Sequence, residues 1–390
     1  MSEPMTRREA LHAAAVGGLC WGAGLASLHA ADDPLADLAD QRQFIKEAMF
    51  YEKLSNQRVK CTLCPRECRV ADRERGFCGA RENRAGTYYT LVHSRPCSIG
   101  RADPIEKKPL FHYLPGTDAF SIATAGCNME CQFCQNWEIS QFRPEQVRST
   151  YLPPEKVVEL SRRQRAPTVA FTYSEPTIFY EYMYDTAKAG RARGVGGAMI
   201  SNGYISEAAM VKLCEQLTVV KIDLKAFTNK FYQDVCAGTL EPVLHTLKTL
   251  KRIGIWFEIV VLIIPTLNDS AKEIREMCEW VRRELGPDVP IHFSRFHPTY
   301  RLQNLPRTPV KTVDMARKIA LNAGLHYAYL GNVPTHPGEN TYCPKCGATV
   351  IKRVGFYATP SGLKDGKCAK CGRPIAGVWS QEQALAPRGG

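Results

Sequence analysis

The sequence has little that would fit a membrane protein or a disordered chain. After residue 31 no apolar run approaches the roughly 20 residues that a membrane-spanning helix needs. Hydrophobic residues nevertheless make up 44% of the 390 residues, which excludes a disordered chain and is enough for one large core or two smaller ones. We therefore expect a folded globular protein.

Acidic residues are also scarce, with 39 Asp and Glu against 51 Lys and Arg, so the formal net charge is +12. Residues 341–390 hold eight of the basic residues against two acidic ones, and they also hold four cysteines. Bound to a divalent metal as thiolates, these cysteines would add about two negative charges. The basic balance therefore does not by itself predict a nucleic-acid partner, and we do not expect one.

The first thirty residues lack charge after one basic pair. Arg7 and Arg8 are followed by no charged residue from Leu11 to Ala31, as in a twin-arginine export signal. The match is partial, because Ala10 stands where a larger apolar residue is usual and the cleavage region lacks a small-x-small site. A leader that is retained in the cytoplasm is the alternative. We expect cytoplasmic residence, with export by the twin-arginine route as the other possibility.

Sixteen cysteines are many for this length, and most of them stand in tight groups. Disulfide frameworks belong to small domains without a core, whereas cysteines two or three residues apart suit metal centres. We expect the five isolated cysteines to be small buried hydrophobic residues. The three groups are Cys61, Cys64, Cys68 and Cys78; Cys127, Cys131 and Cys134; and Cys343, Cys346, Cys368 and Cys371, while the isolated ones are Cys20, Cys97, Cys214, Cys236 and Cys278.

From residue 116 onward short apolar runs alternate with stretches of helical period. This alternation predicts a parallel sheet covered by helices, arranged as a whole or partial (β/α) barrel or as an open doubly wound sheet. "PPEKVVELSRRQ" from Pro153 and "SAKEIREMCEWVRREL" from Ser270, with its capping pair Ser270 and Glu273, predict two of the helices. The apolar runs are residues 119–125, 168–173, 197–201, 219–224, 256–264, 291–296 and 325–330.

Polar clusters follow six of these runs, at the carboxyl end where barrel enzymes build their sites. All six would face one mouth, which favours a partial (β/α)6-type TIM barrel. We place a leader and linker in residues 1–50, a Cys-rich segment in 51–115, the barrel in 116–335, and a zinc-ribbon-like module with a tail in 336–390. The clusters contain Cys127, Cys131 and Cys134; Glu175; Asn202; Asp223 and Lys225; Asn268 and Asp269; and Arg295 and His297.

The segment "CNMECQFC" offers three cysteines where most metal sites use four. In a [4Fe-4S] cluster each iron normally has one thiolate, so Cys127, Cys131 and Cys134 would hold three irons and leave the fourth open to a substrate or cofactor. The alternative is a zinc ion or an ordinary cluster completed by a distant cysteine such as Cys97.

The C-x3-C-x2-C motif after the first barrel strand is similar to the signature of the radical S-adenosylmethionine (radical SAM) enzymes. The resemblance implies that SAM chelates the open iron. It also implies that an electron from a flavodoxin or ferredoxin cleaves SAM to methionine and a 5'-deoxyadenosyl radical. That radical abstracts hydrogen from a protein or small-molecule substrate. "YSEP" resembles the family motif that binds the SAM ammonium group, which implies that role for Glu175.

Further motifs extend the resemblance. "SNG" with Ser201 and Asn202, and "DLK" with Asp223 and Lys225, resemble the segments of glycyl-radical activating enzymes that meet the SAM ribose and carboxylate. "FHPTY" implies a place near the nucleoside for His297. "CTLCPRECRV", "YSEPTIFYEY" and "GNVPTHPGENTYCPKCG" are similar to a narrower group, the radical SAM component of AmmeMemoRadiSam systems.

The two outer cysteine groups predict further metals. Cys343, Cys346, Cys368 and Cys371 form two C-x2-C knuckles separated by 21 residues, which indicates a structural zinc ribbon or rubredoxin-like iron. Cys61, Cys64, Cys68 and Cys78 are spaced less regularly and could hold zinc or an auxiliary cluster, with a closed structural site preferred. The alternative function is a zinc-ribbon nucleic-acid-binding protein in which every cysteine group is structural. Such a protein would not need the polar residues at the strand ends.

Overall fold

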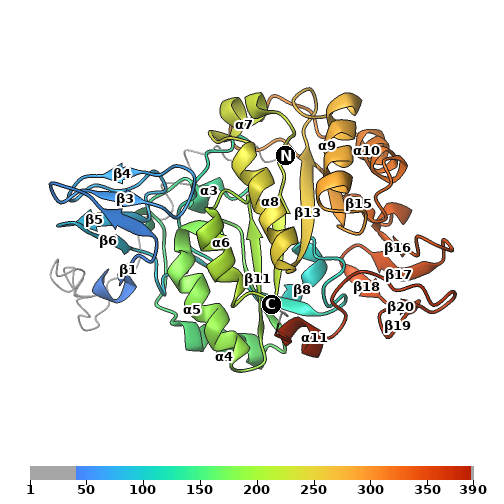
Figure 1. Ribbon diagram of the computed structural model, residues 1–390, viewed down its shortest axis with the longest axis horizontal. Helices are drawn as coiled ribbons and strands as arrows, with labels where there is room; N and C mark the ends of the chain where they lie inside the picture. The colour runs from blue at the N-terminus through green and yellow to red at the C-terminus, as the bar shows by residue number, and fades with distance from the viewer. Residues whose placement is uncertain (1–40, 388–390) are drawn as a thin grey trace, which may run out of the picture. The chain divides into compact units, whose positions relative to one another are not determined.

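The computed structural model describes residues 41–387 (Figure 1). The predicted leader and Cys20 lie outside the described residues, so the twin-arginine interpretation stays a prediction. None of the helices within residues 41–387 combines the length and the apolar character needed to cross a bilayer.

A nine-stranded sheet forms the centre of the molecule, and seven of its strands are parallel. Each of the seven apolar runs overlaps one of these strands. They follow one another across the sheet in the order of the chain, unlike the reversed order of a doubly wound sheet. The parallel strands are β9 (Asp118–Ala123), β10 (Thr168–Phe171), β11 (Gly196–Ser201), β12 (Val219–Asp223), β13 (Trp256–Ile263), β14 (Ile291–Arg295) and β15 (Ala328–Gly331); the antiparallel β7 (Ser98–Ile99) and β8 (Asp103–Pro104) pair with β9.

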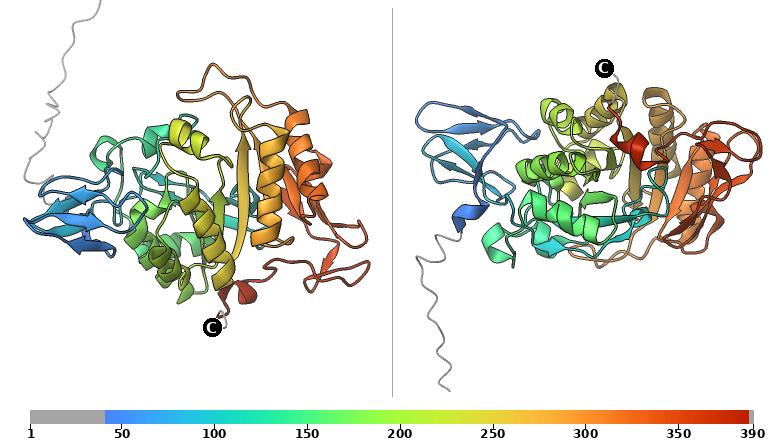
Figure 2. Two further views of the ribbon diagram at one scale, coloured as in Figure 1. Left: turned by 45° about the horizontal axis from the view of Figure 1, so that its top comes forward. Right: turned by 90° about the horizontal axis from the view of Figure 1, so that it is seen from below.

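Helices fill the connections between the parallel strands and lie along one face of the sheet (Figures 1 and 2). Ser270 caps α9 by accepting a hydrogen bond from the Glu273 N–H at 3.2 Å, as its sequence predicts. The Glu273 carboxylate accepts from Phe227 N at 2.7 Å. These helices are α4 (Pro154–Arg163), α5 (Tyr180–Arg191), α6 (Glu207–Cys214), α7 (Asn229–Cys236), α8 (Glu241–Ile253), α9 (Ala271–Glu284) and α10 (Val310–Asn322).

The two faces of the sheet differ because side chains alternate along each strand. Residues such as Phe171, Val220 and Ile222 point to the helices and belong to the main apolar core. Lys221, between the last two, lies on the other face and is 5% exposed. That second face carries buried polar residues such as Lys221 and, elsewhere along the strands, a small apolar cluster that includes Val219.

The Cys-rich segment, together with the preceding Lys46–Glu47, forms two small antiparallel sheets, which the sequence analysis did not anticipate. A buried ion pair joins it to α5, with Arg81 NH2 2.5 Å from Glu181 Oε2. Removing one partner of such a pair typically costs about 3–5 kcal/mol. The strands are β1 (Lys46–Glu47), β2 (Tyr51–Lys53), β3 (Val59–Cys61), β4 (Arg69–Val70), β5 (Arg81–Arg84) and β6 (Thr87–Thr90).

The C-terminal segment is fastened to the sheet through a buried arginine. Arg353 donates to Phe111 O at 2.7 Å and Glu339 O at 3.1 Å, while Glu258 of β13 accepts from Phe111 N at 3.0 Å. Its strands are β16 (Thr341–Tyr342), β17 (Thr349–Val354), β18 (Tyr357–Thr359), β19 (Leu363–Lys364) and β20 (Lys367–Cys368). The short helices within the described residues are η1 (Arg42–Phe44), η2 (Ile105–Lys107), α3 (Trp137–Ser140), η3 (Pro144–Gln146), η4 (Pro176–Phe179), η5 (Pro337–Glu339) and α11 (Gln381–Leu385).

Candidate active site

The loop after β9 carries the three central cysteines. Two of their sulfurs accept backbone hydrogen bonds: Cys127 accepts from Met129 N at 3.4 Å, and Cys134 accepts from Asn136 N. The Cys134 sulfur also lies 3.1 Å from the Ser140 hydroxyl. Polar groups directed at sulfur stabilise the thiolate form that binds metals.

A fourth cysteine meets this loop, and it is Cys236 at the end of α7. The Glu130 N–H donates to its carbonyl oxygen at 3.0 Å. A hydrogen bond from the Cys236 thiol lowers the pKa of Cys131 although burial opposes this, and burial raises the pKa of Cys236 well above its ordinary value. The Cys236 side chain therefore lies against the Cys131 sulfur. The alternative partner Cys97 directs its sulfur to Ala123 O, at 3.6 Å.

Glu175, in the loop after β10 and at the N-cap of η4, is the most densely hydrogen-bonded carboxylate of the site. Its Oε1 accepts from Thr177 N at 3.0 Å, Thr177 Oγ1 at 2.7 Å and Ser201 Oγ at 2.7 Å. Its Oε2 accepts from Asn202 N at 2.8 Å. Burial raises the pKa of Glu175, and these four donors oppose the rise. Oε2 holds only one of these donors, so it can accept a further one.

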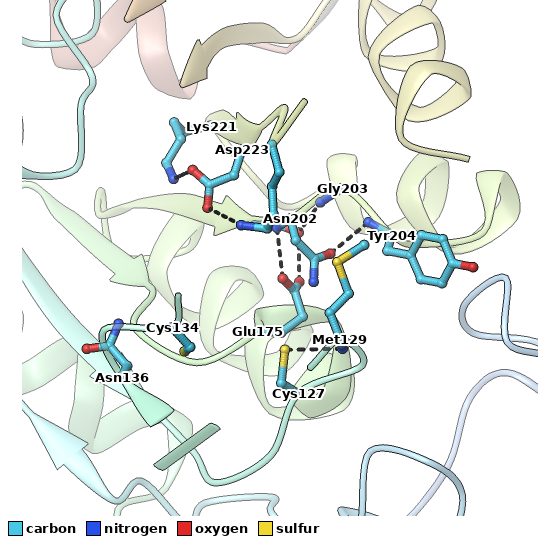
Figure 3. A network of polar contacts seen from close by, with 12 residues as sticks. Cys127, Met129, Cys134, Asn136, Glu175, Asn202, Gly203, Tyr204, Lys221 and Asp223 are labelled. Carbon is cyan, nitrogen blue, oxygen red and sulfur yellow. Dashed lines mark hydrogen bonds and ion pairs between the residues drawn. The ribbon is translucent and has the colours of Figure 1, made fainter. Parts of the chain in front are cut away.

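Asn202, directly after β11, is hydrogen-bonded to Glu175 (Figure 3) and also contacts the cysteine loop. Its side-chain amide donates to Asn128 Oδ1 at 2.9 Å, and Asn128 follows Cys127 in the chain. The Asn128 amide in turn donates to Tyr204 O at 2.7 Å. Figure 3 shows Cys127 beside the Glu175 carboxylate. Burial is the main cause of the raised pKa of Cys127, and the negative charge of Glu175 raises it further.

Asp223, at the end of β12, is paired with two lysines. Lys221 Nζ is hydrogen-bonded to Asp223 Oδ1, and Lys225 Nζ lies 3.5 Å from Asp223 Oδ2. Burial opposes ionisation of Asp223, but the two ammonium groups lower its pKa below the ordinary value. Burial likewise disfavours the charge of Lys225, and Asp223 with Cys131 raises its pKa well above the ordinary value. Burial lowers the pKa of Lys221, although Asp223 opposes this. The group reaches from the strand end to the cysteine loop, where the Cys131 charge acts on Lys225.

The last two polar clusters differ from each other. Asn268 is a structural residue, because it accepts from Ile264 N at 2.6 Å and donates to Lys225 O at 2.7 Å. His297 is half-buried beside Arg295 and Arg307, and desolvation together with these charges lowers its pKa. Among the contacts of residues 41–387, none joins His297 to the Glu175 or Asp223 groups.

The structure therefore brings most of the predicted residues together and adds three that the sequence analysis missed. Asn128 links two predicted motifs, Lys221 pairs with Asp223, and Thr177 supplies two donors to Glu175. Lys221 could have been found, because a lysine within an apolar strand two positions before Asp223 shares its face.

The C-terminal cysteines also come together. Cys343 and Cys371 lie 3.6 Å apart at sulfur, and Cys346 and Cys368 lie 3.7 Å apart. A tetrahedral ion with metal–sulfur bonds of about 2.3 Å separates its sulfurs by about 3.8 Å. Among residues 41–387, this is the only group of at least three His, Cys, Asp or Glu side chains whose ligand atoms all lie within 4.8 Å of one another. The geometry fits a single metal ion.

Comparison with known proteins agrees with this site. Residues 121–281 match the model of the radical SAM superfamily. An uncharacterized protein of Methanocaldococcus jannaschii is 46% identical over 333 residues, which cover 85% of this chain and 99% of that protein. The pyruvate formate-lyase-activating enzyme of Clostridium pasteurianum is 22% identical over 163 residues, 40% of this chain and 66% of that enzyme. The benzylsuccinate synthase activating enzyme of Thauera aromatica is 25% identical over 130 residues, 33% of this chain and 39% of that enzyme.

The chain therefore belongs to the radical SAM superfamily, as the cysteine motif predicts. It is an enzyme of the radical SAM and activating-enzyme class. This membership favours the enzyme over the alternative of a purely structural nucleic-acid-binding protein.

Proposed function

We propose that Cys127, Cys131 and Cys134 hold a [4Fe-4S] cluster with one open iron, at which SAM binds. When bound, this group supplies reductive cleavage of SAM to a 5'-deoxyadenosyl radical that removes hydrogen from a substrate. The chain supplies the thiolates, the groups that orient SAM, and the exclusion of water. The three cysteines fit such a cluster, because each of their sulfurs has a donor directed at it: the Met129 N–H, the Asn136 N–H or the Cys236 thiol.

The observation that carries this proposal is the position of Glu175. A carboxylate that is 4% exposed and already holds four donors is fixed in place, and Oε2 can still accept from an ammonium group. The Asn202–Asn128 hydrogen bond fixes the same carboxylate relative to the residue after Cys127. Glu175 would thus receive the amino group of a ligand held at the cluster.

The remaining predicted residues extend the site along the strand ends. We assign Ser201 and Asn202 to the positioning of Glu175 and of the ribose, Asp223 and Lys225 to the SAM ribose and carboxylate, and His297 to the nucleoside. Lys221 keeps Asp223 ionised and in place. In our proposal these strand ends belong to a partial barrel over residues 116–335. The leader and linker (1–50) and the Cys-rich segment (51–115) precede this barrel, and the metal module (336–390) follows it.

The partners follow from the chemistry. The electron comes from a flavodoxin or ferredoxin, which favours the cytoplasm. The substrate is a protein or a small molecule, and the activating enzymes among the relatives favour a protein. We also propose that the protein belongs to the narrower AmmeMemoRadiSam group, whose motifs it resembles.

The C-terminal cysteines take a structural zinc ion in this proposal. Four sulfurs close the coordination sphere, whereas a catalytic zinc keeps one position open. The buried Arg353 ties this module to the sheet, so the metal would stabilise the body of the enzyme.

The test is electron paramagnetic resonance of the anaerobically reconstituted, dithionite-reduced protein with and without SAM, together with chromatography of 5'-deoxyadenosine. We expect a cluster signal that changes when SAM is added, and slow release of 5'-deoxyadenosine. Both should be lost in Cys127→Ala and kept in Cys278→Ala, which changes a buried cysteine of α9 outside the site. A wild-type signal that ignores SAM would refute the proposal.

A further inference from the structure

The second set of interest is the N-terminal cysteines, Cys61, Cys64, Cys68 and Cys78, which the proposed reaction leaves without a role. Cys61 ends β3 and Cys68 precedes β4, and the Cys61 N–H donates to Cys68 O at 2.9 Å. Cys64 lies in the turn between them, and Cys78 comes from the following turn. The N–H of Phe77, the residue before Cys78, donates to the Cys68 sulfur at 3.5 Å. The four thiols therefore surround one small region.

Each of these sulfurs accepts a backbone hydrogen bond. Cys61 accepts from Leu63, Cys64 from Arg66 and Cys78 from Ala80, in each case two residues later. Cys68 accepts from Phe77 N at 3.5 Å. Cys127 and Cys134 accept in the same two-residue pattern from Met129 and Asn136. The N-terminal turns thus present sulfur in the way the cluster loop does.

Buried donors without a partner face the same region. Arg81 is 1% exposed, and its Nε and one NH group have no hydrogen-bond partner within residues 41–387. The Tyr88 hydroxyl is equally buried and, in the described chain, equally unpartnered. A Cβ atom at Gly76 would lie 2.6 Å from that hydroxyl and 3.7 Å from the Cys68 sulfur, so the two groups are neighbours. Thiolates and sulfides of a metal centre would give these donors acceptors, and a negatively charged centre would suit Arg81.

The spacing of the sulfurs separates a cluster from a single ion. The C-terminal set gathers its four sulfurs within 4.8 Å, as one ion requires. Within the described chain, neither the N-terminal set nor Cys127, Cys131 and Cys134 brings three sulfurs that close. Thiolates on different irons of a cluster stand farther apart than thiolates on one ion. The N-terminal set, like the radical SAM loop, therefore lacks the close sulfur spacing of a single tetrahedral ion.

This set also touches the radical SAM loop. Arg66, between Cys64 and Cys68, donates to Asn128 O at 2.6 Å. A Cβ atom at Gly126 would lie 2.7 Å from the Cys78 carbonyl oxygen. Cys78 and Cys127 both line one cavity of about 630 Å³. The two cysteine groups are therefore adjacent.

From these contacts we infer that Cys61, Cys64, Cys68 and Cys78 hold a second [4Fe-4S] cluster, closed by four thiolates, which exchanges electrons with the neighbouring centre on Cys127, Cys131 and Cys134. In that exchange one electron leaves an external low-potential donor, resides on the second centre and passes to its neighbour. The donor is oxidised by one electron and the second centre returns to its starting state. The electron-transfer role rests on the proposed function, but the presence of the second cluster does not.

The test compares the full-length protein with two variants after anaerobic reconstitution, by iron, sulfide and zinc content and by electron paramagnetic resonance. The wild type should hold about eight irons, and Cys127→Ala/Cys131→Ala/Cys134→Ala about four, with a signal that ignores SAM. Cys61→Ala/Cys64→Ala should keep about four irons and a signal that responds to SAM. Cys278→Ala is the control and should match the wild type.

The outcomes separate the two proposals. A triple variant without iron, or one with a second zinc ion in place of iron, overturns the second cluster. A Cys61→Ala/Cys64→Ala variant whose cluster ignores SAM overturns the proposed function instead. If that variant does not fold, the wild-type iron content and the triple variant still decide. Electron transfer is tested with two reductants, dithionite and a protein donor. Dithionite should reduce the SAM-responsive cluster of Cys61→Ala/Cys64→Ala as it does in the wild type, whereas the protein donor should reduce it at least tenfold more slowly than in the wild type.

Discussion

Replacing Gly126 by alanine tests the close contact between the two cysteine-bearing loops. Gly126 has a φ of +106°, and a Cβ atom there would lie 2.7 Å from the Cys78 carbonyl oxygen. A positive φ in a non-glycine residue costs about 1–3 kcal/mol, and forcing an extra methyl into a packed contact costs about 1–3 kcal/mol more. The opposing atom is backbone, so it cannot swing aside. We therefore expect Gly126→Ala to lose about 2–6 kcal/mol of unfolding free energy.

Gly194→Ala is the matched control for this experiment. Gly194 has a φ of +72° with no atom within 4 Å of the added Cβ position, so its alanine variant carries only the backbone cost. Urea unfolding of both variants should show the larger loss for Gly126→Ala, with reduced iron content in that variant alone. Equal losses and full iron content in both variants would refute the close packing of Cys78 against the cluster loop.

Three further predictions concern the carboxylates and the C-terminal metal. Glu175→Gln should weaken SAM binding about 10- to 100-fold, because it removes a charged hydrogen bond worth about 1.5–3 kcal/mol, and a titration followed by electron paramagnetic resonance measures this. Burial raises the pKa of Glu106 to about 7, so its protonated form stabilises the fold at low pH and this contribution is lost as the pH rises through about 7. Glu106→Gln should therefore become more stable relative to the wild type from pH 5 to pH 8, by up to about 3 kcal/mol in urea unfolding; a constant difference would contradict the assignment. Cys346→Ser should remove the zinc and lower the melting temperature without changing the iron content, and unchanged zinc would disprove the C-terminal site.

The sheet could be predicted because each parallel strand is buried on both faces and reads as an apolar run. The strand ends could be predicted for the same reason, because a polar residue that follows such a run, as Glu175 or Asn202 does, lies at the carboxyl edge of the sheet. The small sheets of residues 46–90 could not, since strands of two to four residues are too short to show an alternating pattern.

Contacts between distant loops were also beyond the sequence. Asn128 follows Cys127 as an ordinary loop residue, and only the fold places it against Asn202. Cys236 was expected to be a buried hydrophobic residue, and it is fully buried, but its thiol reaches Cys131 because α7 ends there. Three-dimensional closeness of segments a hundred residues apart leaves no periodic signal in the chain.

The hydrogen bonds of Arg66 have a consequence for biosynthesis. This residue donates to the carbonyl oxygens of Asn128 and Ala237, which follow it by 62 and 171 residues. On the ribosome both hydrogen bonds can therefore form only after more than half of the chain has emerged, so until then the N-terminal thiols lack these contacts. Oxygen would meet them during that interval, so we expect the yield of correctly assembled protein to depend on anaerobic growth during synthesis more than on anaerobic handling afterwards.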